Sequence, residues 1–252
     1  MDCAKISIIT ATYNSLPYIV ETYNSIKNQT HLNWEWLITD DCSSDETYNY
    51  LLSISSADER IKVFRNFENS GAAVSRNNSI NNASGDFLAF IDSDDLWCKE
   101  KLRIQLHKML DNELDFTFTA YELINEHSEP LNKIIDSTHN RALCYLDMLK
   151  KQATLGCSTV MLRRSRFPNL SMPLIRTGQD YALWLKLLKD NCQAYPLNEV
   201  LMQYRILPNS ISRNKIRKAK RQWEIYREIE CLSMVKALEC FAFYAWRAIF
   251  RK

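Results

Sequence analysis

The sequence lacks several features that would assign it to a common class. Its 8 cysteines form no CxxC motif and no cluster with histidine, so a zinc site is not indicated. Reduced thiols in a cytosolic protein are the simplest interpretation. No stretch of roughly 18 apolar residues is free of charge, as a membrane-spanning helix would require. The start, MDCAKISIIT, has no basic segment followed by a long apolar run, so no secretory signal is expected.

Length and composition favour one large α/β domain with appendages. The chain has 252 residues, of which 46% are hydrophobic, enough for a substantial core. The net charge is only +2, but residues 213–252 hold eleven Lys and Arg against four Glu. This tail therefore carries +7 and leaves −5 for the rest of the chain.

Hydrophobic patterning divides the first half into alternating strands and helices. Strands are expected at residues 5–10, 34–39, 61–65, 86–91 and 115–121. Helices are expected between them, at residues 17–28, 45–54, 72–83 and 99–111. This alternation predicts crossover units and a Rossmann-like, mainly parallel central sheet with flanking helices.

The second half has a looser pattern, with no internal repeat and no low-complexity linker. A strand is expected at residues 158–165, an amphipathic helix at 180–190 and another strand at 200–206. These elements are expected to complete the same domain and to shape the site of a second substrate.

Polar and acidic residues follow three of the predicted strands. The first strand ends in TATYN (10–14), the second in TDDCSSDE (39–46) and the fourth in DSDD (92–95). Because ligands of such sheets gather at the carboxyl ends of the strands, these groups are expected at one rim. Carboxylates this close raise one another's pKa unless a positive charge lies among them, so DSDD indicates a bound cation.

Five segments resemble the signature segments of family 2 inverting glycosyltransferases with the type A fold, of the kind that builds bacterial O-antigen or capsule. They run in the family's order across residues 6–212: ISIITATYN, ITDDCSSDET, NSGAAVSRNNSINNASGDFLAFIDSDDLW, TGQDYALWLKLL and LMQYRILPNSIS. The resemblance implies a catalytic domain at residues 1–212. Its nucleotide-binding half would end near residue 122, and the acceptor half would follow at 123–212.

The DSDD segment resembles the DxD motif of this family, which holds a divalent metal on the diphosphate of a sugar nucleotide. Asp94 is the first candidate for the metal, Asp92 would share the ion or contact the ribose, and Ser93 would contact the donor. Asp92 and Asp94 are two apart, so on an extended chain their side chains face the same way. Hard oxygen ligands favour Mg²⁺ or Mn²⁺.

Other positions match the family's donor site. Thr10, Ala11 and Tyr13 resemble the residues that line the uridine, and Arg76 resembles the arginine that approaches the diphosphate. Arg76 could equally be an exposed helix arginine, and Tyr13 could be a packing residue.

Asp41 matches the residue that accepts a hydrogen bond from the nucleobase, which suits the imide N–H of uracil. Asp40 is the alternative, and one of the two is expected to cap the next helix. The family often has glycine where Cys42 stands, so the turn is expected to be slightly altered.

Asp180 corresponds to the family's catalytic base at the start of a helix, where the helix dipole stabilises a carboxylate. The family commonly has Glu-Asp here, whereas this chain has Gln179 and Asp180. Relatives frequently carry a histidine where Leu207 stands, and that histidine can join the metal site. Its replacement implies an ion held by carboxylate, diphosphate and water alone.

Simpler interpretations account for the acidic segment less completely. Asp94 or Asp95 could cap the helix that begins near Lys99, and Asp95 is expected to do part of this, but a cap requires one carboxylate rather than three. A haloacid-type phosphatase and a calcium loop are both disfavoured by Leu96.

The resulting hypothesis is a metal-dependent inverting glycosyltransferase that moves a sugar from a UDP-linked donor to a hydroxyl of a glycan acceptor, lipid-linked in surface polysaccharide assembly. One rival is a sugar-nucleotide nucleotidyltransferase, which would need a glycine-rich basic loop that TATYNSLPY lacks. The other rival is a non-catalytic module that binds sugar nucleotides or glycans.

The tail, residues 213–252, is expected to be a basic amphipathic helical extension. Lys236, Glu239, Arg247 and Arg251 fall on one side of a helix and apolar residues on the others. Such a helix can lie in the interface of the inner face of the cytoplasmic membrane. Packing on the catalytic domain and a homodimer contact are the alternatives, and nucleic acid is not an expected partner.

Overall fold

The computed structural model describes residues 4–189, 191–207 and 215–250, and within them nine strands form one sheet. The strands are β1 (Ile6–Thr12), β2 (Trp34–Asp40), β3 (Ile61–Arg65), β4 (Phe87–Phe90), β5 (Leu96–Trp97), β6 (Phe116–Ile124), β7 (Pro130–Ile135), β8 (Val160–Arg163) and β9 (Tyr195–Arg205). The helices are α1 (Leu16–Lys27), α2 (Thr47–Ala57), α3 (Ala72–Asn81), α4 (Lys101–Asp111), α5 (Tyr145–Leu149), α6 (Gln179–Leu188), α7 (Lys215–Glu224) and α8 (Met234–Phe250).

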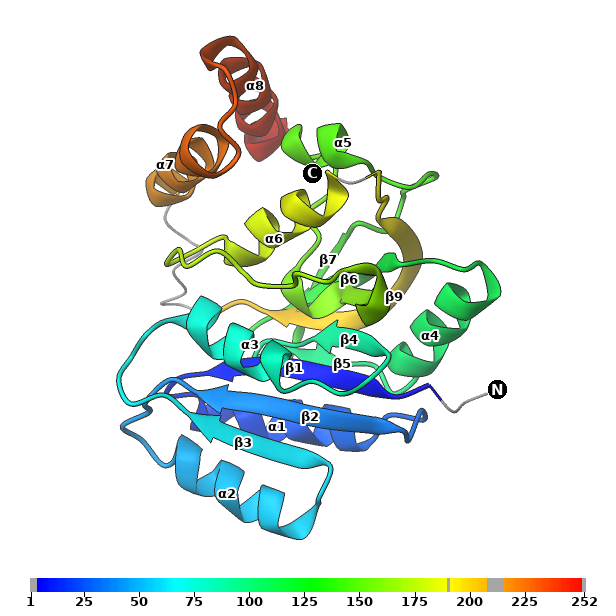
Figure 1. Cartoon of the computed structure of the whole chain (residues 1–252), viewed down its shortest axis with the longest axis vertical. Coiled ribbons are helices and arrows are strands. Elements are labelled where there is room, and N and C mark those ends of the chain that lie inside the picture. Colours follow the sequence, from blue (N-terminus) through cyan, green and yellow to red (C-terminus); the bar gives the residue numbers. More distant parts are fainter. Residues whose placement is uncertain (1–3, 190, 208–214, 251–252) are drawn as a thin grey trace.

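The strand order is β3-β2-β1-β4-β8-β6-β9-β5, with β7 paired to β6 (Figure 1). The first four strands are parallel, as their alternation with helices predicts. The remainder makes the sheet mixed, because β8 runs antiparallel to β4 and β6 while β9 runs parallel to β6. The α/β fold with flanking helices is therefore confirmed, and the parallel part ends at β4.

Side chains of the central strands alternate between two cores. In β4, Phe87 and Ala89 join the core formed with α1, α2 and α4, whereas Leu88 and Phe90 join the core formed with α6. Both faces of the sheet are thus covered by helices, which explains why β1, β2 and β4 are buried along their whole length.

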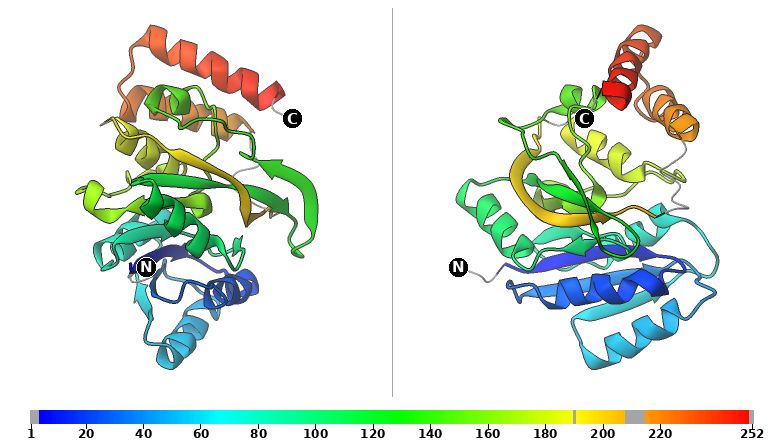
Figure 2. Two further views of the ribbon diagram at one scale, coloured as in Figure 1. Left: turned by 90° about the vertical axis from the view of Figure 1, so that its right-hand side faces the viewer. Right: turned by 180° about the vertical axis from the view of Figure 1, so that it is seen from behind.

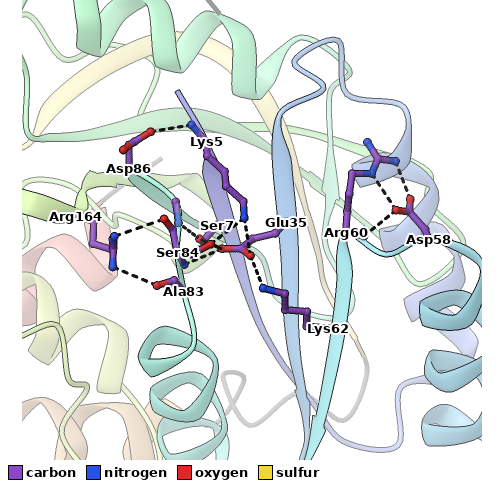
Figure 3. Close-up of polar contacts among 11 residues, drawn as sticks. Lys5, Ser7, Glu35, Asp58, Arg60, Lys62, Ala83, Ser84, Asp86 and Arg164 are labelled. Atoms are coloured by element: carbon purple, nitrogen blue, oxygen red, sulfur yellow. Dashed lines mark hydrogen bonds and ion pairs between the residues drawn. The ribbon is translucent and has the colours of Figure 1, made fainter. Parts of the chain in front are cut away.

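A buried carboxylate ties the amino ends of the central strands together. Glu35 on β2 accepts hydrogen bonds from Lys5 at 2.9 Å, Lys62 at 2.8 Å and Ser7 at 2.6 Å, and the Ser84 N–H and hydroxyl also donate to it (Figure 3). These donors hold the pKa of Glu35 below its usual range despite burial. The cluster lies at the opposite end of the strands from the acidic rim.

Lys101 is a buried cation on α4. It has no exposed surface, its Nζ donates to Gln105 Oε1 at 2.7 Å, and it lies 4.4 Å from the Trp97 ring centre. Burial lowers the pKa of Lys101 from 10.5 to about 7. Because the folded chain binds fewer protons than the unfolded chain between these values, stability should rise with pH across that range. At neutral pH the burial of Lys101 lowers the free energy of unfolding by on the order of 4 kcal/mol.

Lys101→Met should therefore raise the free energy of unfolding by about 2 kcal/mol at pH 7, since the loss of the Gln105 hydrogen bond offsets part of the relief. The gain should fall as the pH rises and become a loss near pH 10.5, where the relief has vanished and only the missing Gln105 hydrogen bond remains. Urea denaturation across this pH range measures it, with Lys108→Met on the exposed side of α4 as the control. A gain that does not change with pH would contradict the explanation.

Several elements were not predicted. The two-residue strand β5, the β6–β7 hairpin and the short helix α5 have no clear pattern in the sequence. The helix predicted at 180–190 is α6, which begins at Gln179 and ends at Leu188, and residue 190 lies outside the described residues. The predicted tail helix is divided into α7, a π-helical turn at Ile225–Ile229, and α8.

The C-terminal helices pack against the domain at the end of the molecule farthest from α2 and β3 (Figures 1 and 2). Ile225, Tyr226, Ala237 and Cys240 are buried and share one core with α5 and α6. Polar contacts reinforce the packing, including a Lys150–Glu239 ion pair at 2.8 Å. One face of the tail is therefore continuous with the core of the domain.

No helix in the described segments is both long enough and apolar enough to cross a bilayer.

Candidate active site

The rim at the carboxyl ends of β1 and β4 is the point where the strand order reverses direction along the chain. This is the position at which open α/β sheets bind ligands. Ala11 is nearly buried at this end of β1, and Tyr13 follows it with 49% of its surface exposed. The Thr10 side chain is instead buried and accepts a hydrogen bond from the Trp36 indole at 2.9 Å, so it supports the sheet from inside.

Asp41 anchors the loop that leads into α3. Its carboxylate accepts hydrogen bonds from Asn66 Nδ2 at 2.8 Å, the Ser70 N–H at 2.8 Å and the Gly71 N–H at 2.7 Å. Asp40 accepts from the Ser43 N–H at 3.0 Å, and its other oxygen is buried without a hydrogen-bond partner among the described residues. A carboxylate has about four lone-pair sites, so either residue retains capacity for one more donor.

Neither Asp40 nor Asp41 caps α2. The Thr47 N–H donates to Asp45 at 3.0 Å instead. In the turn after Asp41, Cys42 adopts a left-handed φ of 64°, a conformation that glycine adopts at lower cost. Cys42 therefore carries backbone strain that a glycine at this position would avoid.

Helix α3 carries Arg76 to the acidic segment. One turn further along, Ser79 donates to the Thr10 carbonyl and shares a hydrogen bond with Thr39, which seats this face of α3 on the sheet. Arg76 is 6% exposed and pairs with Asp92 at 2.5 Å. It is thus a buried arginine at the rim, and the exposed-helix alternative is wrong.

Asp95 does not cap α4, which corrects the prediction for this residue. It is 1% exposed and turns inward, where Oδ2 accepts from the Ser158 hydroxyl at 2.5 Å and Oδ1 from the Arg205 N–H at 3.0 Å. The same Ser158 hydroxyl accepts from the Asp92 N–H at 2.9 Å. Ser158 reaches this position because β8 starts where antiparallel β4 ends.

Arg205, the last residue of β9, holds the other side of the DSDD turn. Its fully buried side chain donates from Nε to the Asp94 carbonyl at 2.7 Å, and it also contacts Glu21 and Ser128 at 2.8 and 2.9 Å. Ser158 and Arg205 were both missed from the sequence. The sequence hinted at them only in that a polar residue, Ser158 or Arg205, stands at the end of an apolar strand segment.

Asp94 is the carboxylate left available by these contacts. Burial, followed by the charge of Asp92, raises the pKa of Asp94 to about 6. Within the described ranges no group of three His, Cys, Asp or Glu side chains converges on a metal position. Asp94, with a raised pKa and a second carboxylate two residues away, nevertheless suits a divalent cation whose other ligands are phosphate and water oxygens.

Asp180 lies in the first turn of α6, close enough to Arg76 and Asp92 for their charges to act on its carboxyl. One turn later Trp184 is fully buried and packs edge-on against Phe90, the last residue of β4, with ring centres 5.3 Å apart. This contact orients the face of α6 that bears Asp180. Burial raises the pKa of Asp180, and the charges of Arg76 and Lys151 oppose the shift.

The predicted site residues therefore come together only in part. Arg76, Asp92, Asp94 and Asp180 interact electrostatically at one rim although they come from different parts of the chain. Ser93 lies in the same turn, where its carbonyl accepts from Thr22 at 3.2 Å. Leu207 is partly buried after β9, and residues 208–212 of the last motif lie outside the described residues.

Two groups near Asp180 carried no sequence prediction. Lys151 follows α5 and lies over the Tyr181 ring, 3.2 Å from its centre. Cys157 is 5% exposed, and burial raises the pKa of its thiol well above the ordinary value. A protonated thiol is a poor nucleophile, so Cys157 fits a packing role.

A cavity of about 540 Å³ lies away from this rim. Asp86, Phe87, Arg163 and Arg164 line it, at the end of β4 opposite Asp92. None of the predicted site residues takes part in it.

Comparisons with known proteins agree with this geometry. The sequence model of glycosyl transferase family 2 matches residues 7–168. The chain is 46% identical to TuaG of Bacillus subtilis, a candidate teichuronic acid biosynthesis glycosyltransferase, over 97% of this chain and 96% of TuaG. It is 39% identical to the UDP-Glc:alpha-D-GlcNAc-diphosphoundecaprenol beta-1,3-glucosyltransferase WfgD of Escherichia coli, over 89% of this chain and 86% of WfgD.

Solved structures share the fold at low identity. TarS of S. aureus in complex with UDP-GlcNAc aligns with a TM-score of 0.75 and 20% identity, over 98% of this chain and 73% of that one. The mannosyltransferase PcManGT of Pyrobaculum calidifontis, in complex with GDP-Man and Mn²⁺, aligns with a TM-score of 0.72 and 14% identity, over 98% of this chain and 70% of that one.

Proposed function

Because the chain belongs to glycosyltransferase family 2, we propose that it transfers a sugar from a UDP-sugar to a hydroxyl of a lipid-linked glycan, with inversion at the anomeric carbon and with a divalent metal. The observation that carries this proposal is the meeting of Arg76, Asp92 and Asp180 at the rim between β1 and β4. A buried cation, a metal-ligating carboxylate and a separate base are the groups such a transfer requires.

The donor diphosphate would lie between Arg76 and Asp94. Arg76 offers guanidinium N–H groups to phosphate oxygens, and Nε is buried without a partner in the described structure. Asp94 and Asp92 would hold Mn²⁺ or Mg²⁺, which when bound supplies positive charge to the departing diphosphate. The residues present fit this ion because two hard carboxylates share the turn.

Asp180 would accept the proton of the acceptor hydroxyl. As that oxygen bonds to the anomeric carbon, the bond from this carbon to the diphosphate oxygen breaks, and UDP leaves with the electron pair. The pKa of Asp180 is raised by burial, which makes it a better base than an exposed aspartate. A single displacement of this kind inverts the anomeric carbon.

A uracil nucleotide is supported by the residues at the end of β2 and by relatives. Asp41, with Asp40 as the alternative, would accept the imide N–H of the base, while Ala11 and Tyr13 would line the uridine. WfgD and WfaP of Escherichia coli are both named as UDP-Glc transferases acting on a diphosphoundecaprenol-linked sugar. We therefore propose an undecaprenol-type, lipid-linked acceptor for this chain as well.

The proposal is tested by measuring UDP released from a panel of UDP-sugars, with Mn²⁺ and with or without a diphosphate-lipid-linked N-acetylhexosamine. Acceptor-dependent release with at least one donor is expected. A non-catalytic binding module would bind UDP-sugars without release. Equal UDP affinity with and without EDTA would refute the metal requirement.

An acceptor embedded in a bilayer requires access to its surface, and the tail offers a suitable face. On α8, Val235 is 79% exposed, Trp246 57% and Leu238 54%, on the side turned away from buried Ala237 and Cys240. On α7, Ile216 and Lys220 are exposed within a strongly basic helix. Apolar side chains beside basic ones suit an anionic lipid surface, so we propose contact with the inner face of the cytoplasmic membrane.

In the full chain, Val235→Glu combined with Trp246→Glu should lower flotation with phosphatidylglycerol vesicles at least about fivefold, because buried apolar surface drives such binding. Truncation is unsuitable because Ile225 and Tyr226 belong to the core. Leu32→Glu, at a residue 69% exposed in the loop before β2, is the matched control. If flotation is unchanged, and the wild-type chain is a dimer that dissociates in the double variant, the exposed face of α8 would instead belong to a homodimer contact.

A further inference from the structure

The C-terminal segment contacts the start of the helix that carries Asp180. Gly178 precedes α6 with a left-handed φ of 73°. A Cβ built there would lie 3.1 Å from Ile225 Cδ1 and 3.6 Å from Arg221 Cγ. The absence of a side chain therefore lets residues 221–225 pack directly against the backbone two residues before Asp180.

Polar contacts fix the same junction. Arg221 Nε donates to the Thr177 hydroxyl at 3.0 Å, and the Arg221 guanidinium also pairs with Glu224 at 2.8 Å. On the other side of Asp180, the Tyr181 hydroxyl donates to the Met148 carbonyl at 2.8 Å, and the buried Tyr226 donates to the neighbouring Leu149 carbonyl at 2.5 Å. The turn that bears Asp180 is thus enclosed between α5 and the C-terminal segment.

The position of Asp180 depends on this turn. Arg76 and Lys151 act on the Asp180 carboxyl through their charges, which attract it without fixing a direction. The direction of the side chain follows from the backbone of residues 178–181. Because a displacement of about 1 Å can cost about 10²-fold in rate, support of this backbone matters for catalysis.

From these contacts we propose that Arg221 and Ile225 are positioning residues for the base. They hold the first turn of α6 so that Asp180 faces Arg76 and Asp92 across the rim. This inference rests on the proposed transferase function, in which Asp180 accepts the proton. It makes the C-terminal segment part of the catalytic apparatus rather than an appendage.

Two substitutions test the proposal in the full chain. Arg221→Met removes the Thr177 contact, and Gly178→Ala introduces a Cβ against Ile225. Each should lower kcat at least about tenfold while the Kd for UDP with Mn²⁺ stays within about twofold, because the donor site lies on the other side of the rim. Glu224→Gln, which leaves the Arg221–Thr177 hydrogen bond in place, is the matched control and should change kcat less than about twofold.

A second substitution distinguishes a local clash with Ile225 from a general loss of folding. Ile225→Val removes the Cδ1 atom that the new Cβ would meet, so in the Gly178→Ala background it should restore kcat at least about threefold. Because alanine at a φ of 73° also strains the backbone, the rescue is expected to be partial. Loss of UDP binding in proportion to kcat would overturn the proposal. So would a kcat loss in Glu224→Gln equal to that in Arg221→Met.

Amide hydrogen exchange gives a readout that does not depend on turnover. Arg221→Met and Gly178→Ala should speed exchange at residues 179–183 by about fivefold or more, with exchange in α3 unchanged. Unchanged exchange at 179–183 would overturn the positioning role whatever the activity. If both variants speed exchange as expected but the wild-type chain transfers no sugar to any acceptor, only the transferase function would be refuted.

Discussion

Replacing Asp180 by asparagine is expected to lower kcat by about 10³-fold while leaving the affinity for UDP within about twofold. A general base contributes typically 10²- to 10⁴-fold, and the amide cannot accept the proton. The substitution is nearly isosteric and removes a carboxylate whose pKa is raised by burial, so the fold should tolerate it. Initial rates of acceptor-dependent UDP release and titration calorimetry with UDP measure the two quantities.

Asp115→Asn is the matched control for this variant. Asp115 is an aspartate close to an arginine, pairing with Arg163 at 3.1 Å, but it lies at the amino end of β6, away from the acidic rim. It should keep near-normal turnover. Near-normal turnover in Asp180→Asn would show that another group takes the proton.

Asp94→Ala is expected to weaken Mn²⁺-dependent binding of UDP by on the order of 10²-fold, because it removes the carboxylate best placed to ligate the ion. The affinity for UDP measured in EDTA should change little, because without the metal it depends only on direct contacts between the protein and the nucleotide. Calorimetric titration with UDP at fixed Mn²⁺, repeated in EDTA, measures both arms. Metal-dependent binding that survives in Asp94→Ala would move the ion away from the DSDD turn.

Asp111→Ala provides the surface control for this experiment. Asp111 ends α4 and is exposed, so its removal changes the charge of the protein by the same amount without touching the rim. A similar loss of affinity in both variants would indicate a general charge effect rather than coordination.

The parallel part of the fold and the position of several candidate site residues at one rim could be predicted because their signals are local. Period-two and helical patterns mark β1, β2, β3 and β4 with the helices between them, and each element boundary agrees to within about three residues. The carboxyl ends of parallel strands share one rim, so Asp41 and Asp92 could be expected there before any side chain was placed.

Other residues could not be predicted, because their partners are distant in sequence. Asp95 was expected to cap the next helix, which is what local sequence favours. It turns inward because Ser158 and the Arg205 N–H, brought by β8 and β9, can satisfy a buried carboxylate there. Thr10 was assigned to the uridine, whereas its hydroxyl is used by Trp36 inside the core.

The amino-acid sequence by itself determined the family, the order of the four parallel strands and the helices between them, and the candidate acidic, basic and base residues, since each depends on residue types at short spacing. Only the tertiary structure decided which carboxylate stays available, that Arg76 is buried against Asp92, and that the C-terminal helices pack beside Asp180. These outcomes depend on competition among buried donors and acceptors from segments that can lie more than a hundred residues apart, and burial allows few unsatisfied groups.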